Sequence, residues 1–243
     1  AQLVSYEQYR ALQEGFNYKM WDWYTGMLVW KNQNPWTALR GFFYDYYLDY
    51  TGGYFGYKHG AAPVHIQFNL NDSSVCILNQ TARDFNNITA SITLYDLHGN
   101  TVSEYSKQLT INAHNLVPLN KVILPKTMTE EVYFLRLILS DKEKVIDENL
   151  YWLSNKPRSY VKLNDLAKVT LKAEIDKTSD NVIVINISNP TEETAFFIHL
   201  KICNQDNELI LPVFLTENYF TLLRGENKQI GLEIDSGILT TEN

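Results

Sequence analysis

The spacing of the apolar residues changes near Pro63, and this change most constrains how the chain can fold. Before it, apolar residues recur at helical spacing, whereas after it they alternate with polar ones, as in residues 64–68 and 88–94. A period of two is typical of strands that bury one face. The sequence therefore predicts a short α/β segment followed by β-sandwich structure.

Two helices and one strand are expected in the first 61 residues. Ser5 and Gln8 form a capping box, which predicts a helix over residues 5–14. The apolar run 27–30 does not alternate, and this indicates a strand buried on both faces. Apolar residues on one helical face predict a second amphipathic helix over residues 35–48. A lone buried strand leaves both edges unpaired, so we expect upstream sequence or another chain to complete this fragment.

A weak internal repeat divides the β part of the chain into two modules. Strand, loop, strand and turn follow one another in residues 74–100 and again in residues 181–207. Residues 155–166 are polar and break the alternation, which is typical of a linker. The fold class is therefore mainly β, with two immunoglobulin-like sandwiches at residues 62–154 and 167–243.

Composition argues against several classes of function. The chain has 28 acidic and 21 basic residues, a net charge of -7, and scattered basic side chains, so nucleic acid is not an expected partner. Its apolar runs are too short to cross a bilayer, and no signal peptide is visible. Cys76 and Cys203 lie in different halves of the chain within apolar runs, which favours buried free thiols over a disulfide.

No metal or cofactor site is predicted. The glycines near the end of the α/β segment lack the lysine of a phosphate loop, and the five histidines lack ligand spacing. Asp22, Asp45 and Asp49 are the acids near the aromatic residues, and we expect Asp45 and Asp49 on the polar face of a helix. Four Asn-x-Ser/Thr sequons, which an Asn-rich chain produces by chance, begin at Asn71, Asn79, Asn87 and Asn186.

Residues 29–36 have the chemistry of a sugar-binding segment. An indole at the end of a buried strand offers a flat apolar face for ring C–H groups, and amides offer donors and acceptors for hydroxyls. The candidates for substrate binding are Trp30, Asn34 and Trp36. A structural alternative stands beside this interpretation: Asn34 only caps the helix, Trp36 lies in the core, and Trp30 closes the end of a barrel.

Eight motifs follow one another along the chain: YEQYR at 6–10, VWKNQNPWTALRG at 29–41, YDYYL at 44–48, GGYFG at 52–56, APVHIQ at 62–67, LYDLHG at 94–99, NLYWLS at 149–154 and LPV at 211–213. In this order they resemble glycoside hydrolase family 2. The resemblance is greatest to the branch of exo-β-D-glucosaminidases and mannosylglycoprotein endo-β-mannosidases. It covers nearly the whole chain.

The resemblance implies that residues 1–61 are the C-terminal end of a catalytic (β/α)8 barrel, with its last strand and flanking helices. Trp30 would then lie at the sugar-facing end of that strand. Hydrolysis in the family retains configuration through a Glu nucleophile and a carboxylic acid/base, and both would lie upstream, so no catalytic residue is expected in this chain.

The implied partners are a β-linked oligosaccharide or glycan, with glucosamine or mannose, and the upstream catalytic domain of the same protein. An extracytoplasmic parent enzyme is favoured. The alternative is a non-catalytic carbohydrate-binding or adhesion protein built from tandem immunoglobulin-like domains, with the N-terminal helices as a docking element. A barrel-like segment discriminates between the two, because an adhesion module has no reason to carry one.

Overall fold

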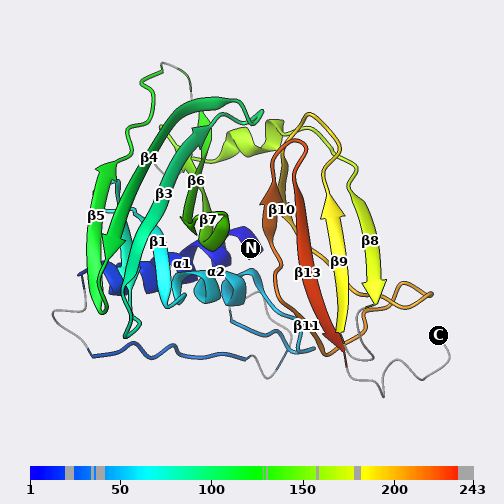
Figure 1. The fold of residues 1–243 in the computed structure, drawn as a ribbon. Helices are drawn as coiled ribbons and strands as arrows, with labels where there is room; N and C mark the ends of the chain where they lie inside the picture. The colour runs from blue at the N-terminus through cyan, green and yellow to red at the C-terminus, as the bar shows by residue number, and fades with distance from the viewer. Residues whose placement is uncertain are drawn as a thin grey trace. The chain divides into compact units, whose positions relative to one another are not determined.

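The computed structural model describes residues 1–19, 25–33, 36, 42–127, 129, 131–156, 159–177 and 182–234. Their contacts divide the chain into two compact units (Figure 1). The N-terminal sandwich unit comprises residues 7–28 and 56–166, and the C-terminal sandwich unit comprises residues 1–6, 29–55 and 167–243. Both are built mainly from antiparallel strands, which confirms the predicted fold class.

Helix α1, Gln2–Lys19, confirms the first predicted helix and extends it at both ends. The capping-box interpretation of Ser5 is wrong, because the backbone N–H of Ser5 already donates to the carbonyl of Ala1 at 2.9 Å within the first turn. The Ser5 hydroxyl is buried and has no hydrogen-bond partner among the described residues. The capping box therefore located the helix correctly but misplaced its start.

The predicted helix at residues 35–48 is wrong over the part that the structure describes. Residues 42–48 form bends and turns, and the helix that does follow, α2, covers Gly52–Gly60. The Asp45 carboxylate explains the turn, because its Oδ1 accepts hydrogen bonds from the backbone N–H groups of Tyr47 (2.8 Å) and Asp49 (3.1 Å). An aspartate that captures nearby N–H groups competes with helix formation. Asp45 and Asp49 thus lie in a turn, not on a helix face.

The predicted buried strand at residues 27–30 is also wrong in this chain. The Leu28 side chain is 100% exposed and the Trp30 side chain is 93% exposed. A strand buried on both faces needs hydrogen-bonded neighbours at both edges. No such neighbour pairs with residues 27–30 in the described part of the chain, so the run stays irregular and open to solvent.

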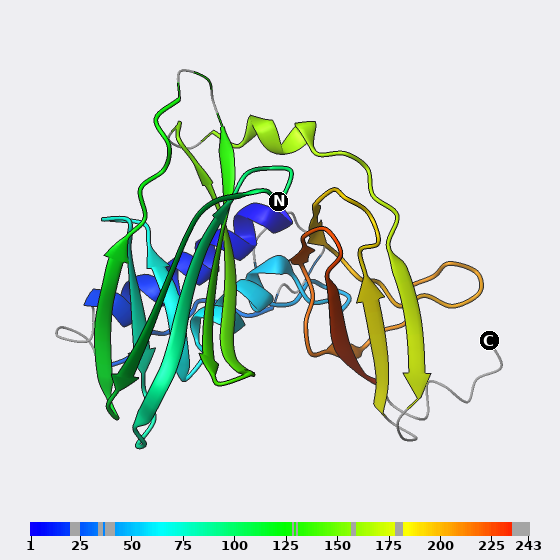
Figure 2. The same ribbon diagram turned by 45° about the horizontal axis from the view of Figure 1, so that its top comes forward.

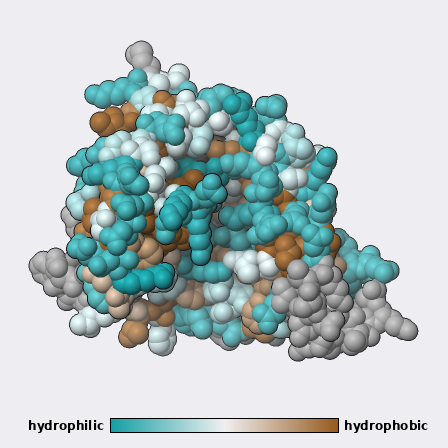
Figure 3. Space-filling model, viewed as in Figure 1, coloured by the Kyte–Doolittle hydropathy of each residue, from teal (hydrophilic) through white to brown (hydrophobic). Residues whose placement is uncertain are grey.

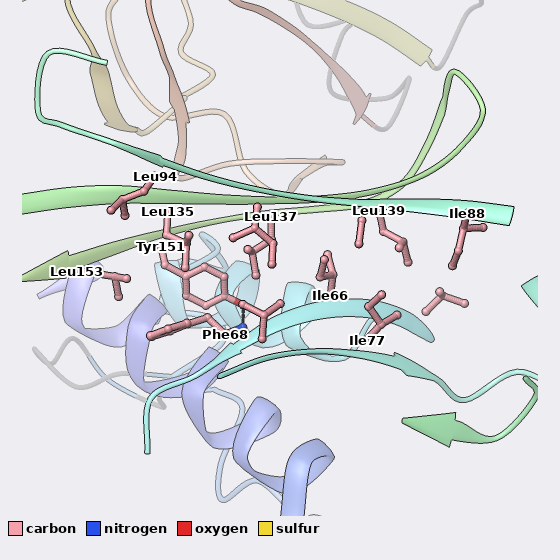
Figure 4. Close-up of a cluster of buried hydrophobic side chains, with 14 of the residues drawn as sticks. Ile66, Phe68, Ile77, Ile88, Leu94, Leu135, Leu137, Leu139, Tyr151 and Leu153 are labelled. Carbon is pink, nitrogen blue, oxygen red and sulfur yellow. Dashed lines mark hydrogen bonds between the residues drawn. The ribbon is translucent and has the colours of Figure 1, made fainter. Parts of the chain in front are cut away.

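The N-terminal sandwich unit consists of two facing antiparallel sheets. One has the order β1-β2-β5 and the other the order β4-β3-β6-β7. The strands are β1 Val64–Asn69, β2 Ser74–Asn79, β3 Phe85–Tyr95, β4 Thr101–Ile111, β5 Asn115–Lys121, β6 Val132–Asp141 and β7 Lys144–Ser154. Alternate side chains of the two sheets meet in one apolar core, in which Ile66 and Ile77 face Leu137 and Leu139 (Figure 4).

The C-terminal sandwich unit has a four-stranded sheet in the order β11-β13-β9-β8 and a two-stranded pair, β10-β12 (Figure 2). The strands are β8 Lys172–Lys177, β9 Val182–Ser188, β10 Ala195–Ile198, β11 Val213–Leu215, β12 Phe220–Leu222 and β13 Asn227–Ile234. A 3-10 helix, η2 Val161–Asp165, lies in the stretch predicted as a linker. The boundaries predicted for the modules stay predictions.

The surface and the cysteines follow from this strand pattern. Most of the face shown in Figure 3 is hydrophilic, as expected when alternating strands turn their polar side chains outward. Both cysteines are free thiols: Cys76 is buried, as predicted, whereas Cys203 is only half-buried. Burial raises the pKa of the Cys76 thiol to about 12. None of the helices in the described residues is both long and apolar enough to cross a membrane.

Two buried asparagines give the internal repeat a structural basis. Asn79 ends β2, and its Nδ2 donates to the carbonyls of Arg83 (2.8 Å) and Asn112 (2.9 Å), while its Oδ1 accepts from the Thr81 hydroxyl at 2.7 Å. Asn189 follows β9 in the same way. Its Oδ1 accepts from the hydroxyl of the threonine two residues on at 2.7 Å, and its Nδ2 donates to the carbonyl four residues on at 2.7 Å. In the sequon that begins at Asn79, the asparagine is therefore buried and its side chain holds the loop together by hydrogen bonds.

Replacing Asn79 by alanine should lower the free energy of unfolding by roughly 2 to 3 kcal/mol, because the loop loses the three hydrogen bonds made by a buried side chain. Urea unfolding of the chain measures this loss. The matched control is Asn71→Ala, which alters an exposed asparagine of another sequon and should change stability by less than about 0.5 kcal/mol. Equal losses in the two variants would contradict the structural role of Asn79.

Candidate functional site

The two candidate tryptophans lie at the surface of the C-terminal sandwich unit. Trp30 is 93% exposed and Trp36 is 61% exposed, so neither indole forms part of that unit's core. Asn34 lies outside the described residues. The Lys31 ammonium lies 5.5 Å from the ring centroid of Trp36 and 5.5 Å from that of Phe42, which is within cation–π range.

Backbone hydrogen bonds fix the stretch that carries these side chains. The Tyr44 N–H donates to the carbonyl of Asn32 at 2.9 Å, and Gln33 forms an isolated parallel bridge with Tyr44. Tyr44 also bridges to Tyr50, and the two rings lie 4.9 Å apart. The backbone that follows Trp30 is therefore hydrogen-bonded to a segment with clustered aromatic side chains, while the indole of Trp30 itself is exposed.

The carboxylates near this segment have structural roles in the turn. Asp45 accepts the two backbone N–H groups described above, and burial, with the nearby Asp45 charge, raises the pKa of Asp49, which Lys201 partly offsets. A glycosidase needs two carboxyl groups on opposite sides of the scissile bond. Two aspartates of one turn do not provide that geometry. Asp22 lies outside the described residues.

A second cluster of ionisable groups, which the sequence pattern does not predict, lies in the N-terminal sandwich unit. The ring of His65 is fully buried between two carboxylates, with Nδ1 2.9 Å from Asp147 Oδ2 and Nε2 3.2 Å from Glu14 Oε1. The Tyr151 hydroxyl donates to Glu14 Oε1 at 2.6 Å, and the guanidinium of Arg10 lies 3.9 Å above the Tyr151 ring. Side chains of α1, β1 and β7 therefore meet in one buried network.

The charge state of this network follows from its geometry. Burial by itself lowers the pKa of His65, but Asp147 and Glu14 outweigh it and raise the pKa to about 9. The imidazolium then donates from both ring nitrogens to the two carboxylates. The cavity beside Glu14 has a volume of about 160 Å³, and typical ligand pockets start near 300 Å³. We therefore assign the network a role in packing α1 on the sandwich.

One sequence signal could have located this network. In β1, His65, Gln67 and Asn69 alternate with the apolar residues that face the sandwich core, yet all three are buried. Their face is covered by α1, where Gln67 Nε2 donates to the carbonyl of Glu14 at 2.8 Å. Polar residues on the outer face of a strand are normally solvated, so only knowledge of the covering helix would have identified them as buried.

Among the residues that the structure describes, no group of three or more His, Cys, Asp or Glu side chains could hold a metal ion.

Comparison with known proteins matches both sandwiches to glycosidase domains. Residues 149–243 match the family model described as the exo-beta-D-glucosaminidase Ig-fold domain. Residues 71–156 match the one described as the mannosidase Ig/CBM-like domain. These matches confirm the resemblance on which the sequence analysis relied.

Individual relatives extend the similarity over nearly the whole chain. The mannosylglycoprotein endo-beta-mannosidase of Lilium longiflorum is 28% identical and aligns with 98% of this chain, and the exo-beta-D-glucosaminidase of Amycolatopsis orientalis is 27% identical over 93%. The crystal structure of an exo-chitosanase from Amycolatopsis orientalis has a TM-score of 0.84, with 25% identity over 99% of this chain. A beta-D-mannosidase from Dictyoglomus thermophilum, at 16% identity and a TM-score of 0.71 over 96% of this chain and 27% of its own, shares the fold.

The chain spans only a minor part of these relatives. It covers 32% of the endo-beta-mannosidase, 25% of the exo-beta-D-glucosaminidase and 32% of the exo-chitosanase.

The His65 network should make the stability of the chain depend on pH. Because the folded-state pKa of about 9 lies above the ordinary value of 6.5, the stabilisation is fully present below pH 6.5 and is lost as pH rises through 9. A shift of this size corresponds to about 3 kcal/mol. Urea unfolding between pH 6 and 10 measures the slope.

The His65→Gln variant should remove this pH-dependent loss, since glutamine does not titrate. The control His98→Gln changes an exposed histidine and should retain the slope of the original chain. A slope that persists unchanged in His65→Gln would assign the effect to other groups.

Proposed function

We propose that this chain, which is similar to the C-terminal part of family 2 glycoside hydrolases, is the C-terminal part or a subunit of a retaining enzyme that cleaves β-linked glucosamine or mannose. The observation that carries the proposal is the extent of the similarity. Alignments reach 98% of this chain, so they include the α/β segment as well as both sandwiches.

In this proposal the chain supplies one wall of the sugar site. Trp30 offers an indole face for stacking on a sugar ring, and its 93% exposure leaves that face available. Trp36, with the Lys31 ammonium beside its ring, is the second candidate contact, and Asn34 is the candidate amide for a hydroxyl. The indoles bind and orient the sugar, while the upstream catalytic domain contributes the nucleophile and the acid/base.

Exposed apolar side chains within residues 28–47 also support an upstream partner. Trp36, Tyr46 and Tyr47 are exposed in the same unit as Trp30, and Leu28, two residues before Trp30 in the chain, is also exposed. Apolar side chains that gather at a surface commonly mark an interaction site. We propose that neighbouring barrel strands cover part of this surface in the complete enzyme and leave the sugar-facing side of Trp30 open.

A tandem immunoglobulin-like adhesion or carbohydrate-binding protein is the other candidate function. Its domains would need no α/β segment, whereas the relatives named above align with this chain from the α/β segment through the second sandwich. The glycosidase proposal accounts for both parts of the chain.

The chain by itself should not hydrolyse chitosan oligomers or β-mannosides, because transition-state charge requires a paired acid and nucleophile. Release of reducing ends, measured at high protein concentration, tests this expectation. Turnover that a single Asp or Glu substitution within residues 1–243 abolishes would place the catalytic pair in this chain and overturn the assignment.

In the complete enzyme, Trp30→Ala should lower kcat/KM about ten-fold or more, since ring stacking contributes on the order of 1 kcal/mol and orientation losses add to it. Its melting temperature should change little, because the exposed indole contributes little to packing.

The matched control is Trp152→Ala, which removes a buried indole of β7 and should cost roughly 3 to 5 kcal/mol of stability. Kinetics of this control should stay near normal at low temperature. If Trp30→Ala instead behaves like Trp152→Ala, with a large loss of melting temperature and normal kinetics, Trp30 belongs to the core.

A further inference from the structure

An aromatic cluster in the C-terminal sandwich unit centres on Tyr219, which is 3% exposed. Its ring centroid lies 6.0 Å from Phe55, 5.3 Å from Phe197 and 4.4 Å from His199, on which it stacks with an interplanar angle of 16°. The Tyr219 hydroxyl donates to the backbone carbonyl of Tyr50 at 3.3 Å. One side chain of the second sandwich thus contacts the stretch that follows the sugar-binding candidates.

The backbone conformation at Tyr219 fixes the position of this ring. Tyr219 has a φ of 56°, a left-handed conformation that costs a non-glycine residue roughly 1 to 2 kcal/mol. Asn218 holds it there: its buried Oδ1 accepts from the N–H groups of Tyr219 (2.9 Å) and Leu200 (2.8 Å), and its Nδ2 donates to the Leu200 carbonyl at 3.1 Å. These hydrogen bonds of the buried Asn218 side chain stabilise one position of the Tyr219 ring.

The contacts continue from Tyr219 toward Trp30 without a break. Tyr50, whose carbonyl accepts from Tyr219, is bridged to Tyr44. The Tyr44 N–H in turn donates to the Asn32 carbonyl, two residues after Trp30. The first link is a hydrogen bond from a side-chain hydroxyl to a backbone carbonyl, and the next two are a bridge and a backbone hydrogen bond. A displacement of Tyr50 would therefore move the backbone next to the indole.

We propose that Tyr219 is a positioning residue for the sugar-facing segment, acting on Trp30 through Tyr50 and Tyr44. The second immunoglobulin-like sandwich then sets the geometry of the sugar site, although none of its side chains is assigned to contact the sugar. This inference rests on the function proposed above for Trp30.

Hydrogen exchange of the 243-residue chain tests the positioning directly. In Tyr219→Leu, the amides of Tyr44 and Thr51 should exchange about ten-fold faster, while those of β13 keep their protection. The control Phe220→Leu changes the next residue, which is similarly buried but packs near the Lys228 ammonium, at 5.7 Å. It should leave the exchange of residues 42–51 unchanged.

Kinetics of the complete enzyme supply the second readout. At a temperature well below both melting transitions, Tyr219→Leu should lower kcat/KM on the order of ten-fold, and Phe220→Leu should not. Tyr219→Phe, which keeps the ring and loses only the bond to Tyr50, should retain most of the activity. If Tyr219→Leu does not fold, Tyr219→Phe carries the test, with exchange of the Tyr44 amide about three-fold faster.

The two readouts separate failure of the inference from failure of the proposed function. Unchanged exchange at Tyr44 in the Tyr219 variants, or equal acceleration in Phe220→Leu, would overturn the positioning role. Faster exchange in the Tyr219 variants alone, in a complete protein without glycosidase activity, would keep the positioning role and reject the proposed function.

Discussion

A fully buried imidazole held between two carboxylates determines how helix α1 packs on the first sandwich. Each buried charge costs several kcal/mol unless it is paired, so Glu14, His65 and Asp147 must come together whenever the unit folds. A helix shifted by one turn would leave the His65 imidazolium facing a single carboxylate. The ion pairs therefore favour one position of α1 along the sandwich. An apolar contact of the same area would discriminate less between neighbouring positions.

Further buried polar contacts extend this interface along α1. Asn17 Nδ2 donates to the carbonyl of Gly60 at 2.8 Å, which ties α1 to the end of α2. A Cβ at Gly60 would lie 3.1 Å from Cβ of Gln13 and 3.2 Å from the carbonyl oxygen of Arg10. The close approach of the two helices therefore favours a glycine at Gly60, the last residue of α2, because a larger side chain would force its neighbours to shift.

Much of the β part could be predicted from sequence, because its local pattern and its tertiary environment agree. Alternation gave strands with one buried face, as in β3, whose burial follows the pattern residue by residue. The repeat identified matching loops, and Asn79 and Asn189 fill equivalent positions in them. The sequence did not reveal that these asparagines are buried, since an asparagine followed two residues later by a threonine has the same letters in an exposed loop and in a buried one.

The conformation of the α/β segment could not be predicted from apolar spacing, because local side-chain hydrogen bonds and close packing decide it. Helical spacing of apolar residues around Phe42 predicted a helix, but the Asp45 carboxylate stabilises a turn instead, and Leu48 adopts a φ of 68°. The glycines of α2 were considered only as a phosphate loop, and no helix was predicted there. At Gly52 a Cβ would lie only 2.5 Å from the carbonyl oxygen of Gln2, so packing and not propensity selects glycine there.

The candidate sugar site combines an ordered backbone with an exposed apolar side chain, and this combination bears on what Trp30 is for. Full burial of a large apolar side chain contributes roughly 2 to 3 kcal/mol to stability. The exposed Trp30 side chain does not make this contribution in the described structure. The chain nevertheless fixes the adjacent backbone through Asn32, Tyr44 and Tyr50. A residue that served only to fill a core would need burial more than orientation. In the function that we propose, the indole meets a sugar ring and needs a defined orientation, which the hydrogen-bonded backbone next to Trp30 would supply.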